Sequence, residues 1–406
     1  MRFLLFILPL AIQAAEIPAL NLASTENQEP PRAIFIDEVT GEEIIIPKER
    51  EEGTRLQIYL DQLNFGPGVI DGKPGQYTKK AIATFNKKYG REEDDIASVQ
   101  QLANQEITQI YAIATVPEAA KKYVDVNFRW GDDRSYQASR KDMPYRSIAE
   151  FMAERYHCSV SLLELFNGSK KINRLKIHDA IRVPNVDPFL IENMSHGRGY
   201  KEDPLLSSRW AVIDTDAHQI RIYQAINPPE IPQTAETQDS SEIEDQTPVV
   251  TSPEPPTRVV IADTSPEETP RAMIIEEEGP AVKLSEYDED RAIVLAAFPI
   301  TPGRPQFIRR GTWKMMNSIE FPTWRYDDSL LKQGVYSKVS LTIPSGPNSP
   351  VGVHWQGLSR RGIGIHGTSN PERIGRGRSA GCIRLANWDV VKMPKLIRPG
   401  ATVIIK

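Results

Sequence analysis

The sequence predicts a multidomain α+β protein in which two small helical units precede a mainly-β C-terminal domain. Helical periodicity is strongest in the N-terminal half, where apolar residues recur every three or four positions in 54–63 and 77–89. Short β-forming runs separated by Gly and Pro dominate residues 291–405. With 406 residues, the chain can build two or three hydrophobic cores.

The composition narrows the classes of function. The formal net charge is −5, a quarter of the residues are charged, and no basic block stands out, so the electrostatic footprint of a nucleic-acid-binding protein is missing. The 32 prolines exceed what a compact enzyme of this length usually carries and indicate extended linkers. Cys158 and Cys382 are too few and too far apart in sequence to suggest a disulfide framework.

Residues 1–15 have the layout of a secretory signal, with a basic start, a short apolar run and small residues at the end. The alternative is a membrane anchor, but the run is interrupted by Pro9 and is too short for the roughly 30 Å hydrocarbon core of a bilayer. We therefore expect export without stable membrane insertion. Residues 16–53 follow as a leader with two strand-like runs.

Two small units are expected next. Residues 54–92 combine two helical stretches with turns such as Asp71-Gly72, and residues 93–143 are expected to hold a helix over 96–113 and a linker. Residues 144–187 predict two helices, opened by Ser147 and Ser159, and a closing strand over 179–184. Cys158 falls before the second helix, where we expect it to be buried in the core.

The C-terminal domain is expected to span residues 208–406. It begins with a predicted hairpin over 210–213 and 219–223 and is then interrupted by residues 227–285. That segment holds ten prolines and thirteen acidic residues against three basic ones, so we expect a disordered acidic insertion. Because a hairpin alone is not stable, it must pair with strands that follow the insertion.

Further strands are expected at seven places, and their short, turn-separated pattern favours a β-sandwich or a barrel-like sheet. They are 291–298, 311–316, 335–337, 342–343, 351–357, 363–365 and 401–405. One helix is expected over 389–396, with Asn387 and Asp389 as capping residues. His354 lies on one of these strands and is interpreted as a structural histidine.

The candidate chemistry lies in residues 363–385, IGIHGTSNPERIGRGRSAGCIRL. Cys382 follows His366 by 16 positions, and a thiol beside an imidazole is a candidate nucleophile pair. Gly381 permits a sharp turn whose N–H groups could face an oxyanion, and Gly367 leaves the imidazole unobstructed. The segment is rich in arginine, at positions Arg373, Arg376, Arg378 and Arg384. We expect this cationic field to favour the thiolate and to attract carboxylates.

The I-H-G-T element and the S-x-G-C-I-R-L element resemble the signature of the YkuD-type L,D-transpeptidase family. Residues 347–358 and 387–389 also resemble that family, whereas Ala380 stands where many members carry a second histidine. The resemblance implies a mainly-β catalytic sandwich with Cys382 as nucleophile and His366 as base. It implies an oxyanion site at Ala380, Gly381 and Gly367, and substrate binding by Arg384, Ser379, Arg378 and Arg376. It implies no metal and no cofactor.

The implied activity is cross-linking or anchoring of peptidoglycan through a cysteine thioester of a stem tetrapeptide, with release of D-Ala. Residues 54–92 resemble a peptidoglycan-binding domain, against the alternative of a generic helical hairpin, and residues 144–187 resemble a LysM module. The expected location is the periplasm or the cell wall, and carbapenem β-lactams are the expected inhibitors. An L,D-carboxypeptidase and a non-catalytic cell-wall binding protein remain alternatives at this point.

Overall fold

The computed structural model describes residues 34–129, 131, 133–226, 287–305, 307–329, 337, 339–360, 362–377 and 381–406. The predicted signal over 1–15 and the predicted acidic insertion over 227–285 lie outside these residues. Across the described part of the chain, no helix has both the length and the apolar character needed to cross a membrane.

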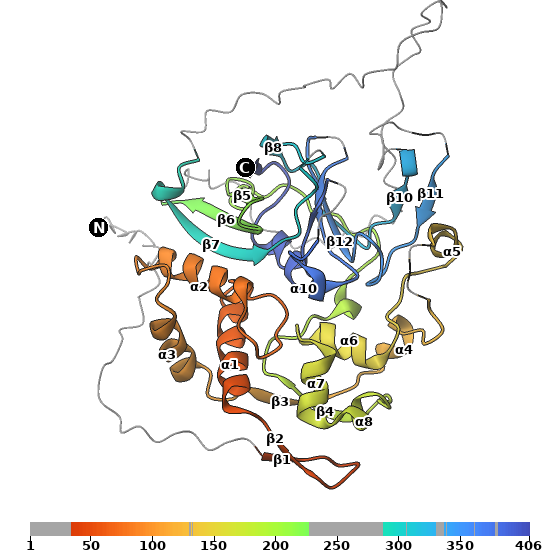
Figure 1. Cartoon of the computed structure of the whole chain (residues 1–406). Helices are drawn as coiled ribbons and strands as arrows, with labels where there is room; N and C mark the ends of the chain where they lie inside the picture. Colours follow the sequence, from red (N-terminus) through yellow and green to blue (C-terminus); the bar gives the residue numbers. More distant parts are fainter. Residues whose placement is uncertain are drawn as a thin grey trace, which may run out of the picture.

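Two sheets form the C-terminal half of the molecule (Figure 1). The first has the strand order β7-β6-β5-β15-β8, and the second has the order β14-β13-β12-β9. The first sheet comprises β7 (Ala292–Pro299), β6 (Gln219–Ala225), β5 (Trp210–Asp214), β15 (Thr402–Ile405) and β8 (Gly311–Lys314). The second comprises β14 (Ile383–Arg384), β13 (Gly364–His366), β12 (His354–Gly357) and β9 (Ile319–Glu320). A separate ribbon pairs β10 (Trp324–Tyr326) with β11 (Leu341–Ile343).

One apolar core lies between these two sheets. Ile222 and Phe298 from the five-stranded sheet belong to the same buried cluster as Ile365 and Ile383 from the four-stranded sheet. The β5–β6 hairpin pairs with β7 on one side and with β15 on the other, so the prediction that it joins later strands is confirmed. The mainly-β sandwich expected for this half is therefore confirmed.

The expected helix over 389–396 is shorter in the structure. It divides into α10 (Asn387–Val390) and the 3₁₀ turn η5 (Met393–Lys395). Pro394 has no N–H to donate, which prevents a continuous α-helical ladder at this point. The expected capping role of Asn387 was wrong, because Ala386 occupies the N-cap and no side chain caps the helix.

Helices and short strands make up the N-terminal half. The helices are α1 (Lys48–Gln62), α2 (Gln76–Lys88), α3 (Ile96–Glu106), α4 (Ala120–Tyr123), α5 (Arg134–Ala138), α6 (Ile148–Arg155), α7 (Val160–Asn167) and α8 (Ser169–Ile172). The strands are β1 (Ile34–Ile36), β2 (Glu43–Ile45), β3 (Tyr111–Thr115) and β4 (Ala180–Pro184). Short 3₁₀ turns occur in both halves at η1 (Ile191–Asn193), η3 (Glu289–Arg291) and η4 (Pro371–Arg373). Ser147 and Ser159 accept backbone N–H groups at the starts of α6 and α7, as predicted.

The expected helix over 96–113 ends early, at Glu106, and β3 follows it. β3 pairs antiparallel with β4 from Tyr111 opposite Pro184 to Thr115 opposite Ala180. The pairing partner lies some 70 positions away in sequence, so helical periodicity gave no sign of it. The segment interpreted as a linker therefore supplies a strand to the second small unit.

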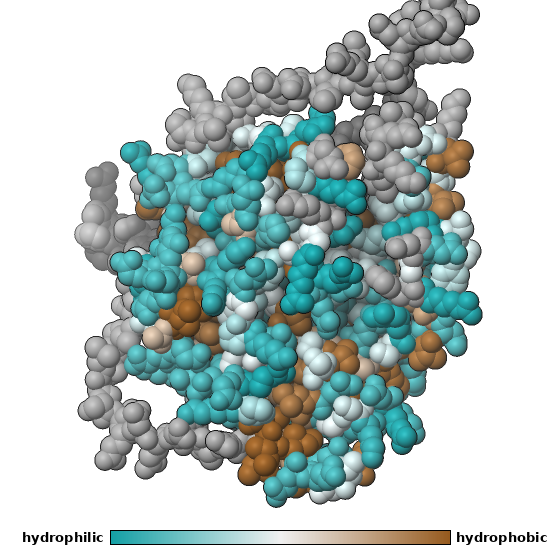
Figure 2. Space-filling view, in the orientation of Figure 1, coloured by the Kyte–Doolittle hydropathy of each residue, from teal (hydrophilic) through white to brown (hydrophobic). Residues whose placement is uncertain are grey.

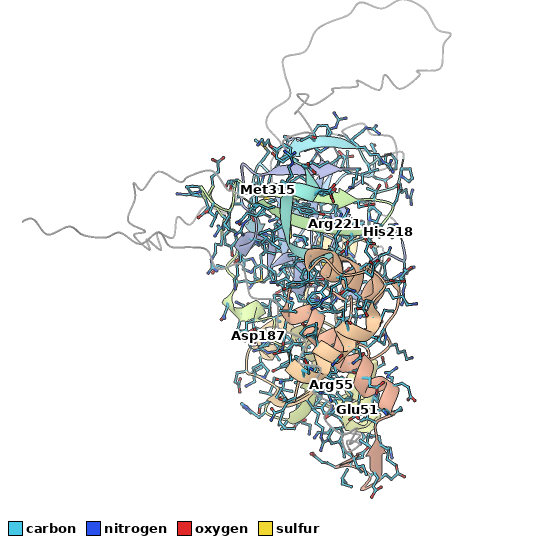
Figure 3. The ribbon with its side chains drawn as sticks, turned by 90° about the vertical axis from the view of Figure 1, so that its left-hand side faces the viewer. Glu51, Arg55, Asp187, His218, Arg221 and Met315 are labelled. Carbon is cyan, nitrogen blue, oxygen red and sulfur yellow. The ribbon has the colours of Figure 1, made fainter. Side chains whose placement is uncertain are left out.

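Backbone hydrogen bonds join the two halves. Gly66 donates to Ala297 O at 2.7 Å, and Ala297 donates to Asn64 O at 2.9 Å, so the turn after α1 extends the edge of β7. Figure 3 shows the molecule from the side, turned by 90° from Figure 1. Glu51 and Arg55 lie in the helical N-terminal half, and Arg221 and Met315 lie in the β-sheet half.

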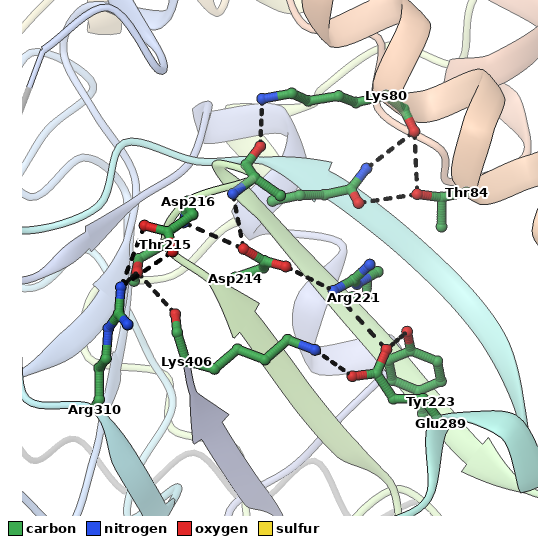
Figure 4. Close-up of polar contacts among 12 residues, drawn as sticks. Lys80, Thr84, Asp214, Thr215, Asp216, Arg221, Tyr223, Glu289, Arg310 and Lys406 are labelled. Atoms are coloured by element: carbon green, nitrogen blue, oxygen red, sulfur yellow. Dashed lines mark hydrogen bonds and ion pairs between the residues drawn. The ribbon is translucent and has the colours of Figure 1, made fainter. Parts of the chain in front are cut away.

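Side chains of α2 also bind the β5–β6 hairpin (Figure 4). Thr84 donates to Gln219 Oε1 at 2.9 Å, and Lys80 donates to the carbonyl of Ala217. Figure 2 shows a largely hydrophilic face on which apolar residues gather near the β1–β2 hairpin. Ile34 and Ile45 belong to that hairpin, and their exposed fractions are 56% and 54%.

Candidate active site

The sheet register brings Cys382 next to the strand that carries His366. β13 runs parallel to β14, with Ile365 opposite Ile383 and His366 opposite Arg384. Cys382 lies in a bend directly before β14, and a backbone hydrogen bond from Gly364, the first residue of β13, acts on its thiol. The thiol lies against β13, because Cys382 Sγ is 3.5 Å from the carbonyl oxygen of Gly362. Sixteen residues of intervening sequence thus return the chain to a neighbouring strand.

The imidazole of His366 is held in one orientation. Its Nδ1 lies 2.7 Å from the carbonyl oxygen of Gly367, and because a carbonyl only accepts, Nδ1 carries the proton. Nε2 is therefore left with a lone pair. The ring stacks on Trp355 with centroids 5.5 Å apart and planes at 16°. Burial and the charge of Arg384 lower the pKa of His366 to about 3, so the imidazole is neutral at physiological pH.

The thiol is also neutral in the resting site. Burial raises the pKa of Cys382, although the Gly364 backbone hydrogen bond and the charge of Arg384 both act in the opposite direction. The expectation that the arginine-rich segment makes Cys382 a thiolate was therefore wrong. Desolvation outweighs the cationic field, and its strength cannot be deduced from charge counts in a sequence. Both the thiol of Cys382 and the imidazole of His366 are therefore uncharged at physiological pH.

Two glycines permit close packing around this pair. A Cβ on Gly364 would lie 2.4 Å from the Trp355 ring, and one on Gly367 would lie 2.1 Å from Asn387 Oδ1. The Gly367 N–H donates to the carbonyl of His354 at 3.1 Å, so this group is already used within the sheet. Gly367 thus positions the imidazole, whereas Gly381, with φ of +126°, makes the turn directly before Cys382.

The predicted arginines have different positions. Arg384 is largely buried, and its backbone is fixed on both sides by β13 and by reciprocal hydrogen bonds with Thr301. Arg376 is exposed and lies near Tyr77 of α2, where its charge opposes the effect of burial on the pKa of the phenol. Three of the predicted site residues, Arg378, Ser379 and Ala380, lie outside the described residues.

His354 is buried in the neighbouring strand β12. Its Nε2 lies 2.9 Å from Ser318 Oγ, and burial lowers its pKa to about 3. His366 is the register partner of Trp355, so its side chain lies on the opposite face of the sheet from that of His354. Both histidines have a lowered pKa, but His354 contacts Ser318 whereas His366 stacks on Trp355.

Sequence reasoning missed Glu154, which supports the site from the N-terminal half. Asn387 Nδ2 donates to Glu154 Oε1 at 2.9 Å, and Asn387 Oδ1 accepts the Val353 N–H at 3.2 Å. Tyr145 donates to the other oxygen of Glu154. Burial raises the pKa of Glu154 to about 8. A carboxyl on α6 therefore orients the amide that packs against Gly367. A glutamate inside a helical pattern carries no sequence signal of this role.

A second buried cluster joins α1 to the segment after α10. Asp61 binds His157 Nδ1 at 2.9 Å and Lys392 Nζ at 3.2 Å. Burial raises the pKa of Asp61, but the charges of Lys392 and His157 outweigh it and hold that pKa well below its ordinary value. No group of three or more potential metal-binding side chains occurs within the described ranges.

Comparison with known proteins identifies the C-terminal part. Residues 279–405 match the L,D-transpeptidase catalytic domain family YkuD. The Bacillus subtilis protein named L,D-transpeptidase YkuD is 44% identical over 59 residues, which cover 14% of this chain and 36% of that protein. An L,D-transpeptidase of Fuscovulum blasticum, named for its position in the ATP synthase subunits region, is 31% identical over 114 residues, covering 28% of this chain and 57% of that protein.

The chain thus spans about a third of the Bacillus protein and just over half of the Fuscovulum protein. Among solved structures, L,D-transpeptidase 3 from Mycobacterium tuberculosis is 13% identical, with a TM-score of 0.26 over 57% of this chain and 76% of that chain. The same enzyme has been solved with a faropenem-derived adduct. The hairpin of β5 and β6 precedes the matched residues 279–405 in the sequence. It nevertheless supplies inner strands of the five-stranded sheet, whose other strands β7, β15 and β8 lie within the matched residues. Residues 279–405 of this chain are thus similar to the L,D-transpeptidase catalytic domain of the YkuD family.

Proposed function

We propose that the chain is an exported peptidoglycan L,D-transpeptidase that works through a cysteine thioester. The observation that carries the proposal is the position of Cys382, directly before β14 and so next to the parallel strand β13 that carries His366, with the lone pair of His366 fixed on Nε2. The family match over residues 279–405 supports the same activity.

In the proposed reaction, Cys382 Sγ attacks the carbonyl that joins the third stem residue to the terminal D-Ala. The thiol proton passes to His366 Nε2, and the oxyanion is stabilised by the N–H groups of Gly381 and Cys382. When the intermediate collapses, the C–N bond breaks, and His366 returns the proton to the leaving amine of D-Ala. The third residue remains on sulfur as a thioester.

An acceptor amine then attacks the thioester, forms the new amide bond and regenerates the thiol. The resting imidazole is neutral, so Nε2 holds no proton before the sulfur attacks. Arg384 belongs to the same S-x-G-C-I-R-L element as Cys382, and it pairs with His366 between strands β14 and β13. Its guanidinium would bind a substrate carboxylate.

The N-terminal half is proposed to hold the enzyme on its polymeric substrate. The antiparallel pair β3 and β4 encloses the consecutive helices α6 and α7, together with the short helices α4, α5 and α8, and this arrangement supports a LysM-like module. Helices α1 to α3 support a peptidoglycan-binding-like unit. Attachment to the glycan would raise the effective concentration of stem peptides. Residues 1–15 would direct the chain to the periplasm or the cell wall.

The test is incubation of the purified full-length mature chain with disaccharide tetrapeptides and with isolated sacculi, followed by muropeptide mass spectrometry. Cross-linked products that have lost one D-Ala are expected, together with a carbapenem adduct on Cys382. Cys382→Ala should abolish both, and Cys158→Ala is the matched control that should keep both. Tripeptides alone would indicate an L,D-carboxypeptidase. A chain that never acylates would indicate a binding protein.

A further inference from the structure

A cavity of about 300 Å³ lies beside β14, between the catalytic sheet and helix α5 of the N-terminal half. Three arginines line it, Arg134 from α5, Arg373 from η4 and Arg384 from β14. The other described lining residues are neutral, and neither Asp nor Glu is among them. Positive charge from both halves of the chain therefore faces the same cavity.

Arg384 is the most constrained of the three. Its N–H and carbonyl are both bonded to Thr301, at 3.1 and 2.9 Å, so its backbone cannot turn away from the cavity. Its buried Nε makes no hydrogen bond to any described residue. Burial lowers the pKa of Arg384, and the positive charge of Arg134 adds to this effect. A guanidinium whose charge is disfavoured by burial and by a second positive charge is stabilised when an anion lies beside it.

Several contacts hold Arg134 in place. Its Nη1 donates to Gln137 Oε1 at 2.7 Å, and Gln137, only 2% exposed, donates in turn to the carbonyl of Gly131 at 2.8 Å. The guanidinium also lies over the rings of Trp324 and Tyr326, at 5.4 and 5.6 Å from their centroids. These contacts restrict the side chain before any ligand binds, which lowers the entropy cost of binding.

The position of the cavity relative to the catalytic pair suggests which anion it binds. Arg384 is the register partner of His366, the residue proposed to protonate the leaving amine. In a terminal D-Ala, the carboxylate is attached to the same carbon as that amine. A leaving residue placed with its nitrogen at His366 can therefore direct its carboxylate along the sheet toward Arg384.

We propose that Arg134 and Arg384 together bind the terminal carboxylate of the D-Ala that leaves, so that a helix outside the catalytic domain selects stems that end at this residue. The inference depends on the proposed function for the identity of the ligand. It adds a substrate-binding residue from a part of the chain that precedes the family match over 279–405.

The experiment compares two probes on the full-length chain with Cys382→Ala, which prevents turnover. The probes are the stem tetrapeptide with a free terminal carboxylate and the same peptide with that carboxyl as a primary amide. Isothermal titration should give at least about tenfold tighter binding of the free acid, as expected for a charge-assisted bidentate contact. This comparison needs no change at Arg134, so it holds even if an Arg134 variant folds poorly.

Arg134→Gln should weaken binding of the free acid about tenfold and leave binding of the amide unchanged, and Arg134→Lys should restore part of the difference. Lys141→Gln is the matched control, because it removes one exposed positive charge from the same segment without touching the cavity. Equal loss with both probes, or no preference for the acid, would overturn the proposal.

Acylation of the chain with Cys382 intact, measured by intact mass, tests the proposed function separately. If acylation proceeds while Arg134→Gln leaves the KM for the tetrapeptide unchanged, the cavity proposal fails and the transpeptidase proposal stands. If the acid preference depends on Arg134 but Cys382 never acylates, the carboxylate site stands and the proposed activity fails.

Discussion

Cys158 and Cys382 both lie in surroundings that disfavour a charged thiolate, but the charged and basic groups near the two sulfur atoms differ. Burial raises the pKa of both thiols. Cys158 lies in the N-terminal core, where its backbone bridges to Ile70 and the one described charge that acts on it, Glu372, is negative. Cys382 has an imidazole on the neighbouring strand and the positive charge of Arg384. Desolvation alone therefore does not distinguish a reactive thiol from a structural one, whereas a positioned base does.

The strongest test of this contrast is to remove the base. His366→Gln should lower the acylation rate by about 10²- to 10⁴-fold, because general-base assistance is lost while the side chain remains polar and of similar size. The rate is measured by stopped-flow or by intact mass with a carbapenem. His354→Gln is the matched control on β12; it should cost stability through loss of the Ser318 contact while leaving acylation within a few-fold. Equal rates in both variants would remove His366 from the mechanism.

A smaller effect is expected in the alkylation of the two thiols. Native Cys382 should react with iodoacetamide faster than Cys158, because Cys382 is partly exposed and Cys158 is buried. Since burial raises the Cys382 pKa above its ordinary value of 9.0, its alkylation rate should still be increasing above pH 9. Peptide mass spectrometry over a pH series measures both rates. A plateau near pH 7 would mean that the thiolate forms before substrate binds.

The smallest effect concerns Glu154, a buried carboxyl of the N-terminal half that accepts a hydrogen bond from Asn387 of the C-terminal half. Its pKa is about 8 in the folded chain against a reference of 4.5, so the folded state favours the protonated acid. The stability that this difference provides is complete below about pH 4.5 and is lost as the pH rises toward 8. Thermal unfolding should therefore show a melting temperature that falls across this range.

Glu154→Gln resembles the protonated acid and should make that decline shallower. It should not abolish it, because burial also raises the pKa of Asp389 to about 7. Asp389→Asn is the companion variant, and each substitution should remove a separate part of the slope. If the glutamine variant kept the full pH dependence, Glu154 would not be titrating in the folded state.

The sequence was informative where function depends on residues close together in the chain. Cys382, His366 and their glycines lie within one short segment, so the sequence alone suggested them as candidate site residues. The helices of the N-terminal half and the strands of the catalytic half followed from periodicity and turn residues.

The features that were missed depend on partners far away in the chain. Asn387 and Glu154 are 233 positions apart, and β3 is recognisable only through its pairing with β4. The ionisation of Cys382 was mispredicted for a related reason, because burial is a property of the folded molecule and outweighed the local charges.

The hydrogen bonds between Asn64, Gly66 and Ala297 have a practical consequence for anyone who isolates the catalytic part. β7 is an edge strand of its sheet, and the turn after α1 covers that edge. A recombinant fragment beginning near residue 208 would expose both the bare edge and the indole of Trp388, which packs on His157 in the intact chain. Exposed strand edges recruit other chains, so such a fragment should aggregate or exchange strands. Inhibitor screens and crystallisation trials are better begun with both halves in one polypeptide.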